Sequence, residues 1–460
     1  MRAGSGSLGT NVAGRLDRLP ISSVHRIVIV GLAFAYFFDI GDINTFAYAA
    51  PALIKAMGLS VSSIAMITSL SFLGMFLGAV TGGWFADKVG RKRGLIYTIA
   101  IYSVASLLNA LAWDTFSLGL FRFLTGLGLS STIVTANTYI SEFFPASSRG
   151  KYQAWAMTFG LLGIPVTSWV ARFVIPLAPW AWRLVFVWGA LGVVALFFVS
   201  KMVESPRWFD VHGREDEAEA VLGRVEAKAS AEKGPLPPAK PTLGQEVVAS
   251  VPYQELFQGR YLGRTVLLLA VWVFQTLGFY GFASWVPTLL VQHGFSVVSS
   301  LTYSSIIALG APLGAFVATL VAERIDRKWS LTTVSLAIAV FGLLYGATFQ
   351  PLLIVAFGFL VTVSMQAFAP LLYAYSPELY PTEARASGTG LTYGVGRLAN
   401  VVGPLIVGFL FVGYGYQSVF GYIAACWLIV ALATGIFGPR TGKRTLEQLS
   451  RSEIKRPMAA

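Results

Sequence analysis

The stretch "YISEFFPASSRG", Tyr139 to Gly150, decides the fold because it returns as "YSPELYPTEARA", Tyr375 to Ala386. The two copies lie 236 residues apart, and the same offset carries "ADKVGRK" at 86–92 onto "AERIDRK" at 322–328. It also relates the glycine pair Gly74 and Gly78 to Gly310 and Gly314. One register kept over so long a stretch predicts two similar halves in parallel orientation.

The composition indicates that these halves lie in a lipid bilayer. Of the 460 residues, 55% are hydrophobic and only 12% are charged. The apolar residues fall into about twelve runs of roughly 20, the length of a helix that crosses the hydrocarbon core. A β-barrel would instead show alternating segments of about ten residues. We therefore expect an all-α membrane protein with twelve transmembrane helices in two six-helix halves.

The charges and the breaks between runs predict the domain organisation. The formal net charge of +12 would suit nucleic acid, but the positive residues gather in alternate connections and in the C-terminal tail. By the positive-inside rule, these loops and both termini face the cytoplasm of a multi-pass cell inner-membrane protein, and no nucleic-acid partner is expected. The expected segments are an N-terminal half at 1–200, a cytoplasmic linker at 201–262, a C-terminal half at 263–438 and a cytoplasmic tail at 439–460.

The linker contains an amphipathic segment followed by a proline-rich one. "GREDEAEAVLGRVEAKASAEK", residues 213–233, predicts a cytoplasmic helix with acidic residues leading. "PLPPAKP", residues 235–241, ends it as a stiff connection. We expect a joint between the halves whose charges form a solvated face.

Several motifs in this frame resemble those of the major facilitator superfamily. "GGWFADKVGRKRG", Gly82 to Gly94, is similar to its loop signature between spans 2 and 3, and "RFLTGLGLSSTIVTANTYISEFFPASSRG" to its span 4 signature. "ESPRWFDVHGREDEA" and "GPRTGKRTLEQLS" resemble sugar-porter signatures after spans 6 and 12, although Arg440 stands where those proteins have an acid. The resemblance implies a secondary transporter that works by alternating access.

The loop signature predicts a conformational latch. Asp87 should accept hydrogen bonds from a helix N-terminus of the opposite half, where the helix dipole favours an anion. Arg91 can pair with acids at helix ends, and we expect Glu142 to pair with Arg149. Such contacts would hold the outward-open state, whereas the alternative is a basic loop that only orients the protein. The expected latch residues are Asp87, Gly90, Arg91, Glu142, Arg149, Glu323, Arg327, Glu378 and Arg385.

Two acids in the first span break the repeat. In "YFFDIGDINTFAYAAPAL", residues 36–53, Asp39 and Asp42 have Gln275 and Gly278 as counterparts, and Arg122 in span 4 has Gly358. Helix rise places Asp42 and Arg122 roughly 10 to 12 Å inside the same membrane face, so the two side chains could meet. Buried ionisable groups in a membrane are expensive and usually functional.

The pair has a structural and a functional interpretation. The structural one is a permanent ion pair that fixes helix packing. The functional one is a proton switch: removal from water favours a protonated carboxyl and a nearby guanidinium opposes it, so moving Arg122 would let Asp42 take a proton. "DIGD" with "APAL" also resembles the span 1 signature of the aromatic acid:proton symporters, although that family has Asp-Gly-x-Asp. The resemblance implies that Asp42 carries the proton, with Arg122 tuning it and Asp39 assisting.

A second buried cation suggests the solute. Arg397 lies about 16 Å into span 11, where a guanidinium could hold a carboxylate by paired hydrogen bonds; it could equally serve a backbone carbonyl or a distant acid. Polar and aromatic residues of the same half could stack a ring and bind its substituents. The expected substrate-binding residues are Arg397, Gln275, Tyr280, Gln366, Tyr373, Tyr393 and Asn44.

No motif predicts an enzyme. The sequence has no nucleotide-binding Walker motif, no metal-ligand spacing and no nucleophile beside a base, so we expect no metal and no cofactor other than the proton gradient. The expectation is a monomeric proton symporter of a small organic solute, with an organic or aromatic carboxylate preferred. A sugar or polyol symporter, a proton-driven exporter and a non-transporting membrane sensor remain as alternatives.

Overall fold

The computed structural model describes residues 11–239, 251–321 and 325–441, and every regular element in these ranges is helical. Within these described ranges, eleven helices are long and apolar enough to cross a membrane. The twelfth spanning helix is α4, Arg91–Ala110, whose first turn is basic and which packs beside α5 in the same bundle. The expected twelve-helix architecture is therefore confirmed.

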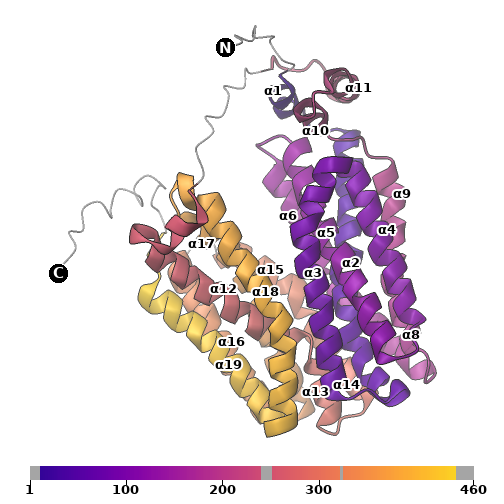
Figure 1. Cartoon of the computed structure of the whole chain (residues 1–460), viewed down its shortest axis with the longest axis vertical. Helices are drawn as coiled ribbons and strands as arrows, with labels where there is room; N and C mark the ends of the chain where they lie inside the picture. The colour runs from indigo at the N-terminus through magenta and orange to yellow at the C-terminus, as the bar shows by residue number, and fades with distance from the viewer. Residues whose placement is uncertain (1–10, 240–250, 322–324, 442–460) are drawn as a thin grey trace, which may run out of the picture.

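The chain forms two bundles, one from each half (Figure 1). The spanning elements of the first bundle are α2 (Ser23–Met57), α3 (Val61–Val89), α4, α5 (Thr115–Phe143), α6 with α7 (Arg149–Leu161, Gly163–Val174), and α8 with α9 (Trp182–Ala190, Val194–Ser200). Those of the second are α12 with α13 (Leu262–Ala283, Val286–Gln292), α14 with α15 (Val297–Ala308, Gly310–Val321), α16 (Arg327–Ala347), α17 (Pro351–Glu378), α18 (Thr382–Tyr414) and α19 (Tyr416–Leu432). A π-helical turn, Ala433–Phe437, extends α19.

The internal repeat reappears as repeated helix ends. Gly58 ends α2 and Gly294 follows α13, both with positive φ, of 66° and 104°. Two residues later Ser60 and Ser296 cap α3 and α14, each accepting a hydrogen bond of 3.0 Å from the backbone N–H three residues on. A glycine tolerates the left-handed backbone and a serine satisfies a free helix donor. The same glycine and serine therefore form the turn between the first and second spans of each half.

Glycines also set the close packing of helices within each half. A side chain at Gly74 or Gly78 would collide with the backbone of Phe123 and Leu127 on α5. In the second half, Gly310 and Gly314 meet Phe359 and Val363 of α17, at positions 236 residues further on. These glycines are close-packing points, as their spacing predicts.

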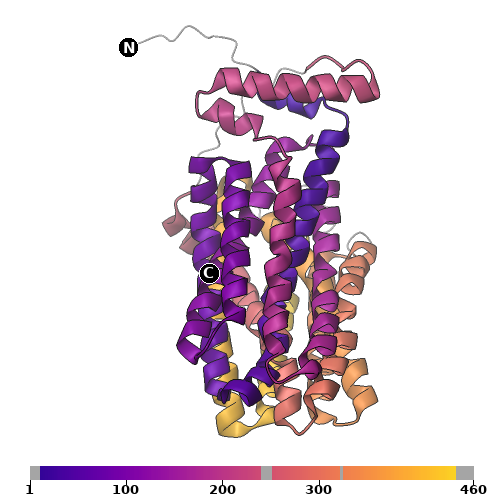
Figure 2. The same cartoon turned by 90° about the vertical axis from the view of Figure 1, so that its right-hand side faces the viewer.

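Three short helices form a cap over the end of the first bundle (Figure 2). They are α1 (Val12–Asp17), α10 (Pro206–Val211) and α11 (Glu215–Lys233). The apolar face of α11, including Val221, Leu222 and Val225, is buried in one cluster with Val12 and Leu16 of α1. The amphipathic helix of the linker is thus confirmed, but α1 was not anticipated.

The expected solvated face of α11 is partly wrong, because its acids bind the N-terminal segment. Arg15 donates to Glu219 and Glu226, at 2.5 and 2.7 Å. Arg18 donates to Glu226 at 2.6 Å, and Ser23 at the start of α2 binds Glu232. The linker helix is therefore tied to the first half by charged hydrogen bonds as well as by its apolar face.

The two bundles touch at the end away from the cap and diverge toward it (Figure 1). A buried apolar cluster crosses between them there, with Phe46 and Leu53 of α2 packed in the same core as Trp285 and Leu289. Two hydrogen bonds between described residues also join the halves, Ser69 to the carbonyl of Val401 and Arg172 Nε to Thr302 Oγ1 at 2.5 Å. The molecule is closed at this end.

Candidate functional site

Asp42 and Arg122 meet inside the first bundle. Asp42 lies on α2 and Arg122 on α5, both buried, and Arg122 Nη1 is 3.9 Å from Asp42 Oδ2. Asp42 Oδ1 accepts hydrogen bonds from Ser106 at 2.9 Å and from Thr45 at 3.0 Å. The two residues are brought together as their depths in the helices predict.

The guanidinium of Arg122 is held loosely. Its Nε donates to Ser71 and its Nη1 to Thr45, both at 3.3 Å, and it lies 5.6 Å from the ring centre of Phe46. These bonds are longer than the 2.7–2.9 Å that is usual for charged hydrogen bonds. The geometry is that of two opposite charges in contact without a locked bidentate pair.

The backbone makes room for the carboxylate. Gly189 of α8 lies so close to Asp42 and Ser106 that a side chain there would overlap both. At Gly278, which corresponds to Asp42 in the repeat, a Cβ would instead lie 2.5 Å from the indole nitrogen of Trp427. The second half fills this place with an aromatic ring, so the acidic site belongs to the first half alone.

Asp39, one turn from Asp42, has no such partners. It is fully buried, and within the described residues neither carboxylate oxygen has a hydrogen-bond partner. Its charged neighbours are Asp42 on its own helix and Arg397 across the interface between the halves. Asp39 therefore interacts electrostatically with both the acid–arginine pair and the partly buried Arg397.

Arg397 is surrounded by aromatic side chains. Its Nε donates to the hydroxyl of Tyr393 at 2.8 Å, and its guanidinium lies 5.0 Å from that ring. The rings of Tyr373 and Tyr393 are 5.8 Å apart, and the charge of Arg397 acts on both and on Tyr280. Four of the expected substrate residues are thereby gathered into one cluster.

Sequence reasoning missed the residue that orders this cluster. Trp272 of α12 meets Tyr373 and Tyr393 edge to face at 5.2 and 5.1 Å, and its indole donates to Ser376 at 3.0 Å. Its counterpart in the repeat is Tyr36, which donates to Asn137, the counterpart of Tyr373, at 2.6 Å. In the sequence, the offset pairs the aromatic residues Tyr36 and Trp272, and this likeness is the signal that would have found Trp272.

Three expected substrate residues make contacts elsewhere. The amide of Asn44 donates to Ile40 of its own helix at 2.9 Å, and Gln275 donates to Thr276 beside it at 2.5 Å. The Cβ of Gln366 packs under Gly314 at the α15–α17 contact. Gln275 Nε2 also lies 3.4 Å from the carbonyl of Trp272, next to the Arg397 cluster, and a role of these three residues in binding stays a prediction.

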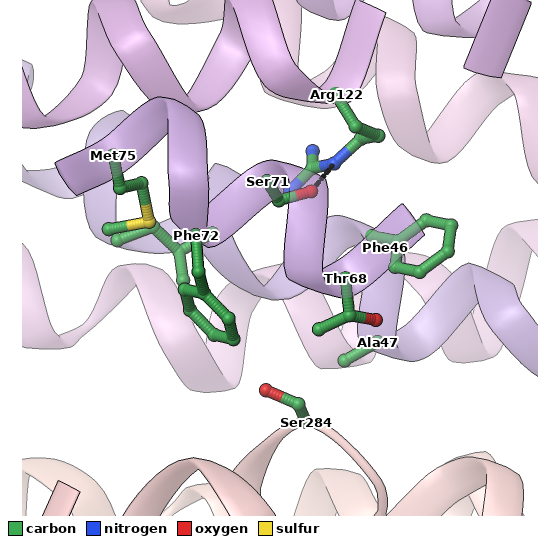
Figure 3. A pocket seen from close by; sticks show the side chains of 9 residues that line it. Phe46, Ala47, Thr68, Ser71, Phe72, Met75, Arg122 and Ser284 are labelled. Carbon is green, nitrogen blue, oxygen red and sulfur yellow. Dashed lines mark hydrogen bonds between the residues drawn. The ribbon is translucent and has the colours of Figure 1, made fainter. Parts of the chain in front are cut away.

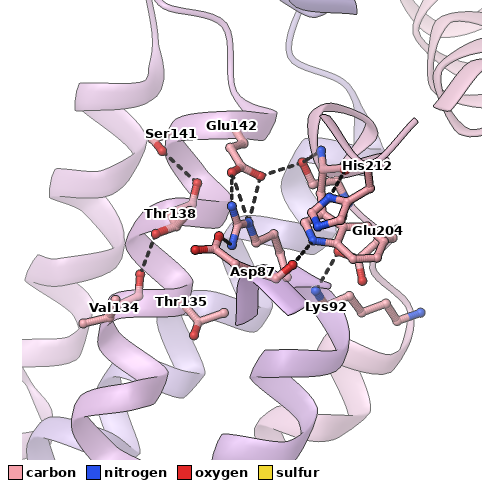
Figure 4. A network of polar contacts seen from close by, with 12 residues as sticks. Asp87, Lys92, Val134, Thr135, Thr138, Ser141, Glu142, Glu204 and His212 are labelled. Carbon is pink, nitrogen blue, oxygen red and sulfur yellow. Dashed lines mark hydrogen bonds and ion pairs between the residues drawn. The ribbon is translucent and has the colours of Figure 1, made fainter. Parts of the chain in front are cut away.

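The latch residues form a network within the first half (Figure 4). Arg91, at the start of α4, donates to Glu142 at 2.7 Å and also pairs with Asp87, whose side chain is 61% exposed. Glu142 therefore pairs with Arg91 and not with Arg149, which lies exposed at the start of α6. Asp87 likewise bonds within its own half and not to the opposite one.

The anion at the start of α4 is Glu204, which was not predicted. Its Oε1 accepts from the backbone N–H of Lys92 at 2.8 Å, the place that a helix dipole favours for a carboxylate. Gly90 has φ of 103°, and a side chain there would lie 2.5 Å from this carboxylate. The glycine of the loop signature is thus required for the acid of "ESPRW" to dock.

The second half repeats part of this network. Arg327 pairs with Glu378, the counterparts of Arg91 and Glu142. Arg385 donates to the carbonyl of Pro377 at 3.2 Å, whereas Glu323 lies outside the described residues. Within the described ranges, no group of three potential ligands could hold a metal ion.

Comparisons with known proteins agree on one family. Residues 24–452 match the family model described as "Sugar (and other) transporter". YyaJ of Bacillus subtilis (strain 168), named for metabolite transport, is 49% identical over 438 residues, which are 95% of this chain and 97% of that protein. The niacin transporter NiaP of Acinetobacter baylyi is 32% identical over 441 residues, covering 95% and 99% of the two chains.

A solved structure has the same fold. The partially occluded inward-open xylose transporter XylE of E. coli matches with a TM-score of 0.73 at 18% identity, covering 92% of this chain and all of that one.

Proposed function

Because this chain belongs to the sugar (and other) transporter family and has the major facilitator fold, we propose that it is a proton-coupled symporter of a small organic acid, preferentially an aromatic carboxylate. The proton would bind at Asp42 and the solute at the Arg397 cluster. By the positive-inside rule, the cap and both termini would face the cytoplasm. The closed end would then face the outside, and the state would be an inward-facing one.

The observation that carries the proposal is the aromatic cluster around Arg397. A guanidinium in a membrane interior needs an anionic or strongly polar partner, and one of its hydrogen bonds goes to Tyr393. Its other donors can hold a carboxylate as a bidentate pair. The rings of Tyr373, Tyr393 and Trp272 supply faces and edges for an aromatic ring.

Relatives support the same chemistry. The 32%-identical protein is named as a transporter of niacin, an aromatic carboxylic acid. A gallate transporter of Pseudomonas putida is 27% identical over 426 residues, and gallate is another aromatic carboxylate. The family model, named for sugar and other transporters, makes a sugar the second candidate, which Gln275 and Gln366 would bind through their amides.

Coupling follows from the position of Asp39 between the two sites. A carboxylate bound to Arg397 would neutralise the cation that acts on Asp39, and an acid buried without a partner is suited to hold a proton. Solute binding would thus favour proton binding on the same half-cycle. Asp42 would take up the proton when Arg122 moves away, and Asp39 would assist it.

A thermal-shift screen of the purified chain with nicotinate, gallate, benzoate and xylose tests the solute class. We expect stabilisation by at least one aromatic carboxylate and none by xylose. The positive compound is then used in proteoliposomes, where solute-driven alkalinisation of the outer medium should accompany its uptake. Binding without flux would identify a sensor, and stabilisation by xylose alone would favour the sugar alternative.

A further inference from the structure

A small cavity lies beside Arg122 where the two halves meet (Figure 3). Its volume is about 20 Å³, and it is lined by Thr68, Ser71 and Phe72 of α3, Ala47 of α2, Arg122 of α5 and Ser284 of the opposite half. A water molecule needs about 10–15 Å³ and two to four polar partners. The cavity therefore has room for one water, and it is partly open and not fully enclosed.

The polar atoms around the cavity suit a water. Thr68 and Ser71 donate their own hydrogens to backbone carbonyls at 2.7 and 3.0 Å, which leaves lone pairs on their oxygens as acceptors. The oxygen of Ser71 already accepts from Arg122 Nε. Arg122 carries five N–H donors, and its described bonds use Nε and Nη1 at a long 3.3 Å. A water here could accept from the guanidinium and donate to Thr68 or Ser284.

The repeat shows that this polarity is particular to the first half. Ser71 corresponds to Ile307 and Arg122 to Gly358, and a Cβ at Gly358 would lie 2.5 Å from Ile307. The equivalent place in the second half is thus filled by an apolar side chain. The polar lining therefore accompanies the acid–arginine pair.

Ser284 closes the cavity from the other half. It lies in the break between α12, which ends at Ala283, and α13, which begins at Val286. The equivalent residue Tyr48 lies inside the continuous helix α2. Beside Ser284, the ring of Phe72 packs against the ring of Tyr280, with 4.8 Å between the ring centres. These two rings cover the same contact between the halves.

We propose that this cavity holds one water molecule and is the port through which protons from the side opposite the termini reach the Arg122–Asp42 pair, with Ser284 as its closing residue. The proposal rests on the proton coupling proposed above. While the halves touch, a single water leaves Arg122 poorly solvated and attracted to Asp42. When they separate, bulk water solvates the guanidinium and weakens this attraction, because the interaction of two charges falls as the local dielectric rises.

The proton step then balances without another reactant. A hydronium ion from the outer side gives its proton to the Asp42 carboxylate, which becomes a neutral carboxyl, and a water molecule returns to the bulk. Arg122 keeps its charge throughout, since guanidinium is not deprotonated in proteins. Closing of the halves leaves one water behind Ser284.

Single-cysteine labelling tests the port without a known solute. On a Cys426→Ser background, Ala47→Cys places a thiol in the cavity wall, and Ala49→Cys is the matched control, buried on the same helix about 200° around it. Right-side-out and inside-out vesicles are treated with an impermeant cationic methanethiosulfonate, and each site is read by mass spectrometry. We expect the Ala47→Cys variant to react from the outer side only and the Ala49→Cys variant to react from neither.

A covalent link between the two halves provides the second test. Arg172→Cys with Thr302→Cys, joined by a bifunctional methanethiosulfonate, replaces the inter-half hydrogen bond by a covalent link, which should reduce outer labelling of the Ala47→Cys thiol by about tenfold or more. A water-resolving structure of the full chain in this state should also show one density within hydrogen-bonding distance of Arg122. Labelling of that thiol from the inner side, labelling that survives the lock, or an empty cavity would overturn the port.

The outcomes separate the port from the transport proposal. If the Ala47→Cys variant behaves as expected but no aromatic acid moves protons in proteoliposomes, the port stands and the proposed symport fails. If nicotinate or gallate drives proton movement while the thiol of this variant is never reached from outside, the proton enters elsewhere and the port alone is wrong.

Discussion

Asp42 is bound on one oxygen and nearly free on the other. Ser106 and Thr45 hold Oδ1, while Oδ2 faces Arg122 at 3.9 Å. This division lets one oxygen keep the carboxylate oriented while the other exchanges a proton. An amide of the same shape could keep the oriented contacts but could not carry the proton.

Asp42→Asn should therefore uncouple the protein. We expect solute exchange across proteoliposomes to persist while accumulation driven by a pH gradient falls by about tenfold or more. Solute-driven pH change, followed with a fluorescent dye, is the measurement. Persistence of that pH change with intact solute binding would show that Asp42 is not the carrier. Asp39→Asn gives the comparison for the neighbouring acid.

Arg397→Gln should weaken binding of the acid found in the screen. Loss of charged hydrogen bonds costs about 1.5–3 kcal/mol, which is about 10- to 150-fold in Kd. Isothermal titration measures this directly, and Arg224→Gln is the control because Arg224 is exposed and bonds only within α11, to the carbonyl of Ala220. Unchanged affinity in Arg397→Gln would favour the sugar or polyol alternative.

At the scale of helices, contacts between elements decide which state is populated. Arg172 of α7 donates to Thr302 of α14 at 2.5 Å, and this bond joins the halves at the closed end. The latch networks at the other end lie within each half. The described contacts therefore favour closure on the side away from the cap.

Thr302→Val should shift the protein toward the state that is open at that end. Valine keeps the shape but leaves Arg172 without its acceptor, a loss of about 1 kcal/mol or about fivefold in the ratio of states. Spin labels on the exposed ends of α7 and α14 would report a larger fraction of long distances. Thr319→Val, on the same half, removes a hydroxyl bonded only to its own helix at Phe316 and should leave the distribution unchanged.

The docking of α1 on α11 should depend on pH. Hydrogen bonds from Arg15 hold the pKa of Glu219 below its ordinary value of 4.5, and Arg15 and Arg18 outweigh burial to lower that of Glu226. A carboxyl whose folded pKa is depressed stabilises above its unfolded pKa, and this contribution is lost as pH falls through the folded value. Docking should be intact at pH 7 and weaken below about 4.5.

Hydrogen exchange of the α1 amides, corrected for intrinsic rates, measures this loss. Glu226→Gln should reduce their protection already at pH 7, because it removes the acceptor shared by Arg15 and Arg18. Glu215→Gln, in the exposed first turn of α11, is the control. Equal protection in both variants would show that apolar packing alone holds α1.

For the molecule as a whole, the repeat explains what could be predicted from sequence. Span lengths and the 236-residue offset predict two six-helix halves, and the depths of Asp42 and Arg122 predict their meeting. Contacts that depend on which helix ends lie beside one another could not be predicted from span length and the repeat. Glu142 pairs with Arg91 and not with Arg149 because the start of α4 lies beside the end of α5. The spacing of these residues along the chain does not reveal this contact.

The two halves differ in how they supply an anion to the start of a helix. Gly90 and Glu204 correspond to Asp326 and Arg440 in the repeat. In the first half the glycine admits the glutamate to the start of α4, whereas in the second Asp326 itself accepts from the backbone of Lys328 at 3.0 Å. The departure at Arg440 is therefore compensated by the carboxylate of Asp326, which caps α16.

The cap also provides a site from which the movement of the two bundles can be measured. Since α11 packs on α1, α10 and α2, it travels with the first bundle, whereas the short helix Tyr253–Phe257 packs on α12 and α18 of the second. Dyes on Lys228→Cys and Gln254→Cys, both exposed, would act as a spectroscopic ruler between the bundles. Transport could then be watched one molecule at a time as a change in energy transfer, with no label near the solute or the proton.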